Sequence, residues 1–217
     1  MSAVTAPVIV IGFLGGFVNH TDRVHSAVQL AENLRRTYGS AVYAETFENR
    51  RRARAHKEIL ERLDINRDGM LSVEEKRNAR IILYGHSWGG SETVALAREL
   101  EKDGIPVLLT IQVDSVAKIG QRDSEIPANV AEAINFYQPH GIIHGRRSIR
   151  AADATQTQII GSFRFDYAKS SVRCSDYPLT ARIFMKSHIQ IECDPGVWGP
   201  VESLIRSKLL PASPPAL

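Results

Sequence analysis

The sequence predicts an α/β fold, in which a mainly parallel sheet is covered by helices on both faces. Short runs rich in valine, isoleucine and leucine alternate along the chain with longer stretches of helical periodicity. Such alternation is typical of β-α-β units. The runs at 7–11, 81–84 and 105–111 are almost wholly apolar, as strands buried on both faces are. No internal repeat or linker divides the chain, so we expect one domain over residues 1–217.

The elements of the first half follow from capping and turn residues. In order, they are a strand over 7–11, a helix from Asp22 to about Tyr38, a strand over 41–47 and an Arg-rich helix over about 49–63. Asp22 can cap its helix and Gly39 can end it. We interpret the arginines of the second helix as a solvated face rather than an anion site, because acidic residues follow them on the same helix.

The second half continues the alternation. Its elements are a strand over about 79–84, a helix over 91–102, strands over 105–113, 130–137 and 157–165, and an amphipathic helix over 195–209. The Pro-rich tail from Pro211 is expected to be unstructured. The two cysteines, Cys174 and Cys193, could pair or remain reduced, and the sequence alone does not decide between these states.

Composition excludes several classes of protein. The chain has 217 residues, enough for one substantial core, and 43% of them are hydrophobic. Its net charge of +3 is too small to favour nucleic acid as a partner. No apolar run approaches the roughly 20 residues of a membrane-spanning helix. The apolar segment 8–17 lacks the basic start of a signal peptide, so we expect a cytoplasmic protein or an exported one whose leader has been removed.

The most informative motif surrounds Ser87. Residues 84–90 read YGHSWGG and contain the pattern G-x-S-x-G between a predicted strand and a predicted helix. A strand that reverses sharply into a helix exposes its middle residue, and glycines at 85 and 89 let the helix cross close to the strand end. The pentapeptide alone can match by chance in a chain with 15 glycines. In this context it predicts a nucleophilic serine.

With Ser87 on this turn, the chain resembles the α/β-hydrolase family, within it the small bacterial lipases and esterases. The resemblance covers most of the chain in strand–helix order, and the family carries its acid and histidine after the serine. It implies Asp114, at the end of the strand over 105–113, as the acid, with Asp153 as the competitor. It implies His188, in a loop shortly before the closing helix, as the base. His140 and His144 are the competing histidines.

Acyl transfer also needs backbone donors for the oxyanion. The family takes one from the residue after the nucleophile, here Trp88, and one from the Gly-rich loop after the first strand. We assign the second to Phe13, with Leu14 as the alternative. The family more often has histidine where this chain has Ile11, so the match is looser there. Phe13, Phe17 and Trp88 either line an acyl pocket or belong to the core.

A second motif lies in an insertion over about 50–80. Residues 64–75 satisfy D-x-[DN]-x-[DN]-G-x5-E at every specified place and resemble an EF-hand calcium loop. The resemblance implies that Ca²⁺ is held by Asp64, Asn66, Asp68, the carbonyl of Met70 and Glu75. The outgoing helix can run only over about 72–80, and no second loop is present. The loop precedes the strand that leads to Ser87 and lies about 20 Å from the serine, so we expect a structural role for the ion.

The resemblance therefore implies a serine hydrolase that cleaves carboxylic esters through an acyl-enzyme. Its substrate would be a small-molecule or lipid ester, and short or exposed acyl chains are favoured because only 118–128 is long enough to form a lid. Thioesterase or acyltransferase activity would use the same three residues. The alternative from another class is a non-catalytic calcium-binding module on a hydrolase scaffold. The sequence indicates no oligomeric state.

Overall fold

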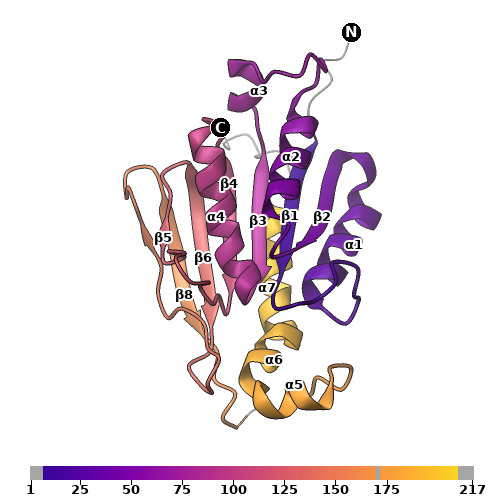
Figure 1. The fold of residues 1–217 in the computed structure, drawn as a ribbon, viewed down its shortest axis with the longest axis vertical. Coiled ribbons are helices and arrows are strands. Elements are labelled where there is room, and N and C mark those ends of the chain that lie inside the picture. Colours follow the sequence, from indigo (N-terminus) through magenta and orange to yellow (C-terminus); the bar gives the residue numbers. More distant parts are fainter. Residues whose placement is uncertain (1–6, 170–171, 210–217) are drawn as a thin grey trace, which may run out of the picture.

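A parallel sheet forms the centre of the protein (Figure 1). The computed structural model describes residues 7–169 and 172–209. In this part of the chain the main sheet has the order β2-β1-β3-β4-β6-β8, and every neighbouring pair is parallel. Its strands are β1 (Val8–Leu14), β2 (Val42–Glu48), β3 (Ile81–His86), β4 (Val107–Val113), β6 (Val130–Tyr137) and β8 (Gln158–Arg164). The predicted α/β architecture is confirmed.

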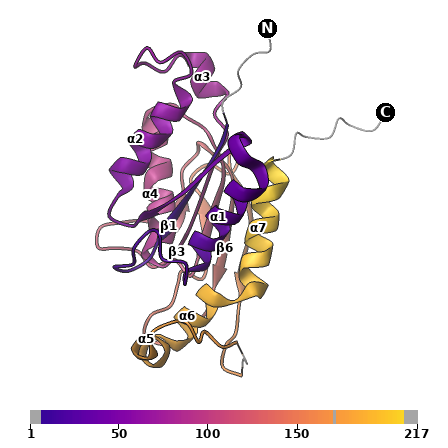
Figure 2. The same ribbon diagram turned by 90° about the vertical axis from the view of Figure 1, so that its right-hand side faces the viewer.

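Helices cover both faces of this sheet (Figure 2). One face carries α1 (Ser26–Tyr38) and α7 (Pro195–Leu209), and the other carries α2 (Arg52–Leu63) and α4 (Trp88–Lys102). A short 3₁₀ turn, η1 (Gly39–Ala41), joins α1 to β2. Each helix buries one apolar stripe against the sheet, which produces two hydrophobic clusters, one on either side.

The alternation within β1 explains why its sequence is apolar at nearly every position. Val8 and Val10 belong to the cluster under α1 and α7. Ile9, Ile11 and Phe13 belong to the cluster under α2 and α4. Successive side chains of a strand point to opposite faces, so a strand covered on both sides needs apolar residues throughout.

Two helices begin later than predicted. α1 starts at Ser26 rather than Asp22, because Asp22 closes a turn in which its side chain accepts a hydrogen bond of 3.1 Å from the Val24 amide. α2 starts at Arg52 rather than near residue 49, after a turn at the end of β2. Asp and Ser compete with helix formation through such local bonds.

The crossovers from β4 to β6 and from β6 to β8 contain no helix in the part of the chain that the structure describes. They instead contribute β5 (Glu125–Ile126) and β7 (Arg150–Ala151), which pair in parallel as a small second sheet. Ile126 and Ile149 of these crossovers are buried in the cluster on the α4 side. The predicted lid segment 118–128 thus includes a strand that is anchored to the core.

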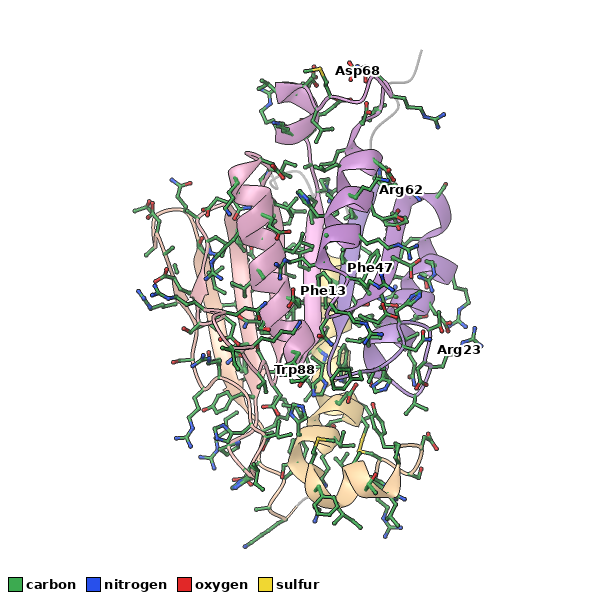
Figure 3. All side chains as sticks on the ribbon, viewed as in Figure 1. Phe13, Arg23, Phe47, Arg62, Asp68 and Trp88 are labelled. Carbon is green, nitrogen blue, oxygen red and sulfur yellow. A yellow bond between two sulfur atoms is a disulfide. The ribbon has the colours of Figure 1, made fainter. Side chains whose placement is uncertain are left out.

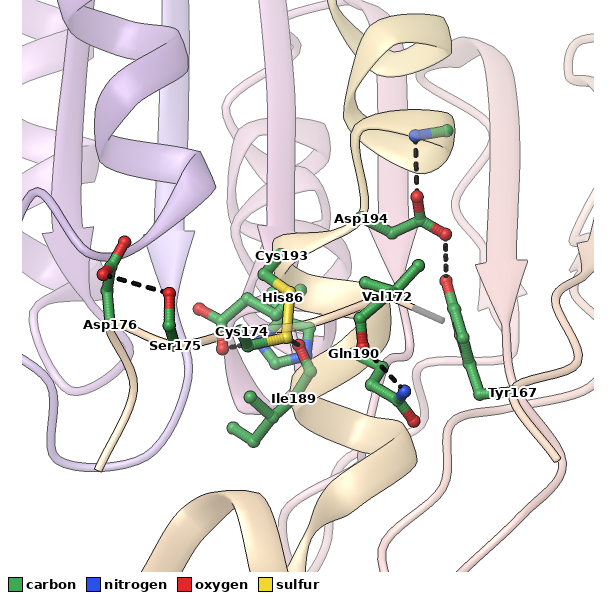
Figure 4. Close-up of a disulfide and its surroundings, with 12 residues drawn as sticks. His86, Tyr167, Val172, Cys174, Ser175, Asp176, Ile189, Gln190, Cys193 and Asp194 are labelled. Atoms are coloured by element: carbon green, nitrogen blue, oxygen red, sulfur yellow. Dashed lines mark hydrogen bonds and ion pairs between the residues drawn. A yellow bond between two sulfur atoms is a disulfide. The ribbon is translucent and has the colours of Figure 1, made fainter. Parts of the chain in front are cut away.

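The C-terminal ends of the strands are covered by α5 (Leu179–Phe184) and α6 (Lys186–Cys193) (Figure 1). Figure 4 shows the disulfide between Cys174 and Cys193, which ties the end of α6 to the preceding loop. The two cysteines, whose oxidation state the sequence left open, therefore form a disulfide. His188 lies within α6, so its predicted place in a loop was wrong.

The EF-hand-like segment lies at the opposite end of the sheet. Its outgoing helix, α3 (Val73–Arg77), is shorter than the predicted 72–80. In Figure 3, Asp68 of the loop lies beyond one end of the sheet, and Trp88 lies near the other end. The tail from Pro211 falls outside the described residues. Among those residues, none of the helices is both long enough and apolar enough to span a bilayer.

Candidate active site

Ser87 occupies a strained turn between β3 and α4. Its backbone has φ 58° and ψ −128°, a region that non-glycine residues rarely adopt. The surrounding structure holds it there. The Ser87 amide donates to the Val113 carbonyl at 3.0 Å, and the Ser87 carbonyl accepts from Gly90 and Val116 at 2.9 and 3.1 Å. The helix begins at once, at Trp88, three residues earlier than the sequence suggested.

The two glycines of the motif are required by close backbone contacts. A β-carbon added at Gly85 would lie 2.4 Å from the Gly89 carbonyl oxygen. One added at Gly89 would lie 2.1 Å from the carbonyl oxygen of Phe13. Real β-carbons do not approach so closely, so a larger residue at either place would push α4 away from the strand ends. The two glycines of G-x-S-x-G are thus required because the turn packs tightly against neighbouring backbone.

Three side chains from separate elements form one hydrogen-bonded chain. His188 Nε2 lies 2.9 Å from Ser87 Oγ, and His188 Nδ1 lies 2.6 Å from Asp114 Oδ2. Because a carboxylate only accepts, Nδ1 carries the hydrogen, and Nε2 of the neutral ring is left to accept from the serine hydroxyl. All three residues are buried, with 8% of Ser87 exposed. The structure brings together the three residues that the sequence selected as nucleophile, acid and base.

Asp114 is held by more than the histidine. Its carboxylate accepts hydrogen bonds from the Gly145 amide at 2.7 Å and from Gln138 Nε2 at 2.9 Å. Burial acts to raise the pKa of Asp114, but the bonds from His188 and Gln138 outweigh it and lower the pKa below its usual value. The carboxylate is therefore ionised at neutral pH. Gln138 and Gly145 were not identified from the sequence. They bond to Asp114 because a later part of the chain folds back onto the end of β4, and no sequence motif marks such a contact.

The competing residues lie elsewhere and have other partners. Asp153 accepts from the Thr155 amide and hydroxyl at 2.8 and 2.7 Å, as a turn residue does. His140 Nε2 lies 2.9 Å from an oxygen of Asp166. His144 is exposed in the loop between β6 and β7. None of the three bonds to Ser87 or His188 within the described residues.

Two stretches of backbone border the serine. Trp88 is the first residue of α4, and the first amides of a helix have no acceptor within it. On the other side runs the end of β1. Phe13 contacts Gly89 through its carbonyl, and a β-carbon added at Gly15 would lie 3.2 Å from Ser87 Oγ. Phe13, Leu14 and Gly15 thus follow the edge of the turn that carries the serine.

The aromatic residues near the serine divide between the two interpretations left open by the sequence. Phe13 is fully buried and packs against Phe47 with ring centroids 6.3 Å apart, so it belongs to the core. Phe17 is 85% exposed and meets Trp88 edge-on at 5.8 Å. The Phe17–Trp88 pair is therefore an apolar surface next to Ser87.

Three further buried residues form a connected group beside His188: His86, Glu192 and His25. The ring of His86 lies 4.5 Å from that of His188. The sequence analysis gave His86 no role, although it directly precedes the serine. The spacing of four residues between His188 and Glu192 was a usable signal, but only once α6 was known to be a helix.

The EF-hand-like loop is closed by its own hydrogen bonds. The side chain of Asp64 accepts from the Gly69 amide at 2.9 Å, and Gly69 has φ 81°. Glu75 reaches back across the loop, where its carboxylate accepts from the Ile65 and Ser72 amides, both at 2.9 Å. Hydrogen bonds from Ser72 and Ile65 lower the pKa of Glu75. Asp64 and Glu75, the first and last acidic residues of the pattern, therefore both bond to backbone amides of the loop.

The ligand atoms of this loop are not drawn into one tight group. Among the described residues, one group of histidine and acidic side chains has its ligand atoms within 4.8 Å of one another. That group lies at the serine and consists of His86, Asp114 and His188. Asp64, Asp68 and Glu75 form no such group. The oxygen donors nevertheless have the chemistry that Ca²⁺ prefers. Binding would require Glu75 to exchange its bonds to loop amides for the ion.

Comparison with known proteins identifies the fold. No family model matches the chain, and no curated protein matches its sequence. A mutant of the esterase rPPE is similar in structure, with a TM-score of 0.50 and 10% identity over 97% of this chain and 77% of that protein. A cutinase-like protein from Cryptococcus sp. has a TM-score of 0.46 and 10% identity over 95% and 97% of the two chains. A putative hydrolase of the α/β superfamily from Xanthomonas campestris has a TM-score of 0.42 and 12% identity over 92% and 99%.

Identities this low bear on the fold alone. The likeness to the esterase rPPE, together with the all-parallel order β2-β1-β3-β4-β6-β8, shows a hydrolase-type α/β fold, as the strand–helix order indicated. A fold hosts many functions, so activity has to be argued from the site.

Proposed function

We propose that this protein is a serine hydrolase that cleaves carboxylic esters through an acyl-enzyme. The observation that carries the proposal is the hydrogen-bonded chain from Ser87 through His188 to Asp114, built on a strained turn. A serine hydroxyl is a weak nucleophile unless a base accepts its proton, and an oriented histidine is the usual base. Strained backbone conformations of this kind cluster at functional sites, so the strain at this buried turn supports a role for Ser87.

In the first half-reaction, Ser87 Oγ attacks the ester carbonyl while its proton passes to His188 Nε2. The ionised carboxylate of Asp114 stabilises the imidazolium that forms and keeps the ring in the tautomer that accepts at Nε2. His188 then gives the proton to the leaving alkoxide. In the second half-reaction, His188 takes a proton from water, the resulting hydroxide attacks the acyl-enzyme, and Ser87 Oγ leaves with the proton.

The tetrahedral intermediate needs donors for its oxyanion. We assign the first to the Trp88 amide, which opens a helix of 15 residues, so the partial positive charge at that helix end acts in the same direction. We assign the second to Phe13, with Leu14 as the alternative. The contact of the Phe13 backbone with Gly89 supports this choice, because it fixes the end of β1 against the first turn of α4.

The surroundings of the serine favour short or exposed acyl chains. The Phe17–Trp88 pair offers an apolar contact at the surface. A thioester or an acyl acceptor other than water would be handled by the same three residues, so thioesterase and acyltransferase activities are the alternatives.

A panel of esters tests this proposal. Purified protein is assayed with p-nitrophenyl esters of two to sixteen carbons and with one acyl thioester, beside the Ser87→Ala variant. We expect turnover that is highest with the short esters and absent in Ser87→Ala. A thioester turned over faster than every oxygen ester would assign the alternative activity. A folded protein inactive on the whole panel would favour the non-catalytic module.

We also propose that the loop over 64–75 binds a structural calcium ion. The side chains of Asp64, Asn66, Asp68 and Glu75 and the carbonyl of Met70 would hold it. A bound ion would fasten the C-terminal end of α2 to α3 and so to the start of β3. Because the loop and Trp88 lie at opposite ends of the sheet, the ion would stabilise the domain without entering the chemistry (Figure 3).

A further inference from the structure

A second buried carboxylate lies beside the residues proposed to act in catalysis. Glu192 is only 3% exposed and lies on α6 four residues after His188, so the two side chains share one face of the helix. Burial acts to raise the pKa of Glu192, but His86 and His25 outweigh it and hold the pKa below its usual value. An ionised carboxylate is costly to bury, and the proposed reaction gives this one no role.

Glu192 bridges two imidazoles. One carboxylate oxygen bonds to Nδ1 of His25, and the other lies 3.4 Å from Nδ1 of His86. Burial disfavours a charge on His25, but Glu192 reverses this effect and raises the pKa of His25. His25 and Glu192 therefore form a buried, hydrogen-bonded pair, which joins the start of α1 to α6.

The other groups around this pair are few. Asp22 lies 3.9 Å from Nε2 of His25, and the Tyr177 ring meets the His25 ring at 5.3 Å. His86 faces Glu192 from the sheet, and His188 faces it from α6. Asp114 acts on His86 rather than on the pair. Of the two members of the pair, Glu192 is the one linked to His188, because its carboxylate lies beside His86, whose ring packs against the His188 ring.

His86 links this pair to His188. Its ring is 2% exposed and lies 4.5 Å from the His188 ring, tilted by 36°. Burial lowers the pKa of His86 to about 4, so the ring is neutral at neutral pH. A neutral imidazole has one N–H, and a carboxylate beside Nδ1 keeps the hydrogen there. Nε2 of His86 has no hydrogen-bond partner among the described residues, which leaves Glu192 to fix the tautomer and rotation of this ring.

From this arrangement we propose that Glu192 is a positioning residue for His188 and acts through His86. Asp114 orients His188 at its Nδ1 edge, and the His86 ring, held by Glu192, supports its face. When His188 becomes an imidazolium, the neutral ring and the carboxylate behind it stabilise the new charge. This inference rests on the proposed ester hydrolysis.

Two substitutions separate charge from shape. Glu192→Gln keeps the size of the side chain and removes its charge, and Glu192→Asp keeps the charge. In Glu192→Gln we expect kcat to fall about tenfold, with KM changed less than twofold, because only the charge-separated transition state is affected. The acid limb of the kcat/KM profile should move to lower pH by about half a unit, because an imidazolium forms less readily beside a neutral amide. Glu192→Asp should retain the wild-type pH profile.

The control is Glu202→Gln, the same chemical change on α7, where the carboxylate bonds to Arg206 and Asn33. It should leave kcat and the pH profile unchanged. Histidine-ring nitrogen shifts give a readout that does not need activity: His86 should carry its hydrogen on Nδ1 in the wild type and a mixture of tautomers in Glu192→Gln.

The outcomes are distinct. If wild-type protein hydrolyses esters and Glu192→Gln retains both the wild-type kcat and acid limb, Glu192 does not position His188. A lower melting temperature in Glu192→Gln with an unchanged acid limb would also overturn the inference, because it would reduce Glu192 to a structural role. Failure of the proposed function itself appears differently, as a folded wild-type protein without esterase activity.

Discussion

Gly15 lies directly against Ser87: a β-carbon added to the glycine would be 2.6 Å from the β-carbon of the serine. No side chain can occupy that position while the serine keeps its place. We predict that Gly15→Ala displaces Ser87 Oγ from His188 and lowers kcat by about 100-fold or more, since a misplacement of about 1 Å can cost that much. The measurement is kcat on the best short ester.

Gly199→Ala is the matched control. Gly199 lies within α7, and a β-carbon there would meet nothing within 4 Å. Alanine favours a helix over glycine by about 1 kcal/mol, so this variant should melt at a slightly higher temperature with unchanged activity. A Gly15→Ala protein that is folded and fully active would show that the contact places no demand on the serine.

Asp114→Asn separates the two acids that the sequence allowed. An amide can present its NH₂ to His188 and favour the wrong tautomer, so we expect kcat to fall by about 10³ to 10⁴. Asp153→Asn, in a turn capped by Thr155, should stay within about twofold of the wild type. Melting temperatures of both variants check that the fold is retained. The opposite ranking of the two losses would place the acid at Asp153.

Reduction of the disulfide should affect stability and activity together. Cys193 follows Glu192 at the end of α6, and the bond to Cys174 spans 19 residues of sequence. Closing a loop of that length contributes about 3 kcal/mol in the chain-entropy model. We predict that Cys174→Ser/Cys193→Ser melts roughly 5–12 °C lower and loses part of its kcat, because α6 carries His188.

The reductant itself is the control in that experiment. Adding it should lower the melting temperature of the wild type toward that of the double variant and leave the double variant unchanged. Equal melting temperatures for the oxidised wild type and the double variant would mean that the bond does not stabilise α6.

The sequence was sufficient for the parts of the site that depend on local pattern. Ser87 is marked by a motif whose glycines leave no room for a β-carbon, since one added there would lie 2.1 or 2.4 Å from a carbonyl oxygen, and Asp114 is marked by an abrupt end to an apolar strand. The strand–helix order then predicted the parallel sheet, because central strands such as β1 and β3 are buried on both faces and are apolar at nearly every position.

The rest depends on contacts between distant segments. Glu192 and His25 are 167 positions apart in the sequence, and Gln138 reaches Asp114 across 24. Nothing in the local sequence encodes such pairs. The helix α6 was also missed, because residues 186–193 have a weak apolar stripe, and the helix is held by its disulfide and by buried polar contacts instead. The start of α1 was misplaced because Asp22 prefers a turn bond to a helix cap.

Removal of calcium tests the proposed loop site. A ligand at 100 times its dissociation constant stabilises the folded state by about 2.7 kcal/mol, so a chelator should lower the melting temperature by several degrees. Activity at low temperature should be unchanged, since the loop is remote from Ser87 (Figure 3). Glu75→Gln should abolish the response to chelator, and Glu74→Gln, next to it on α3, should keep it.

A chelator that leaves the melting temperature of the wild type unchanged would show that the loop holds no stabilising calcium ion. Loss of activity in a chelated protein that remains folded would instead mean that the ion controls the site.

The most direct test of the central claim is covalent labelling of the serine. A fluorophosphonate probe is incubated with the protein, and the labelled peptide is identified by mass spectrometry. We expect one label, on Ser87, and none in Ser87→Ala. His188→Ala should slow labelling by orders of magnitude, because the hydroxyl is activated through the 2.9 Å bond to His188. A folded wild-type protein that takes up no label, or takes it up at another residue, would show that Ser87 is not the nucleophile.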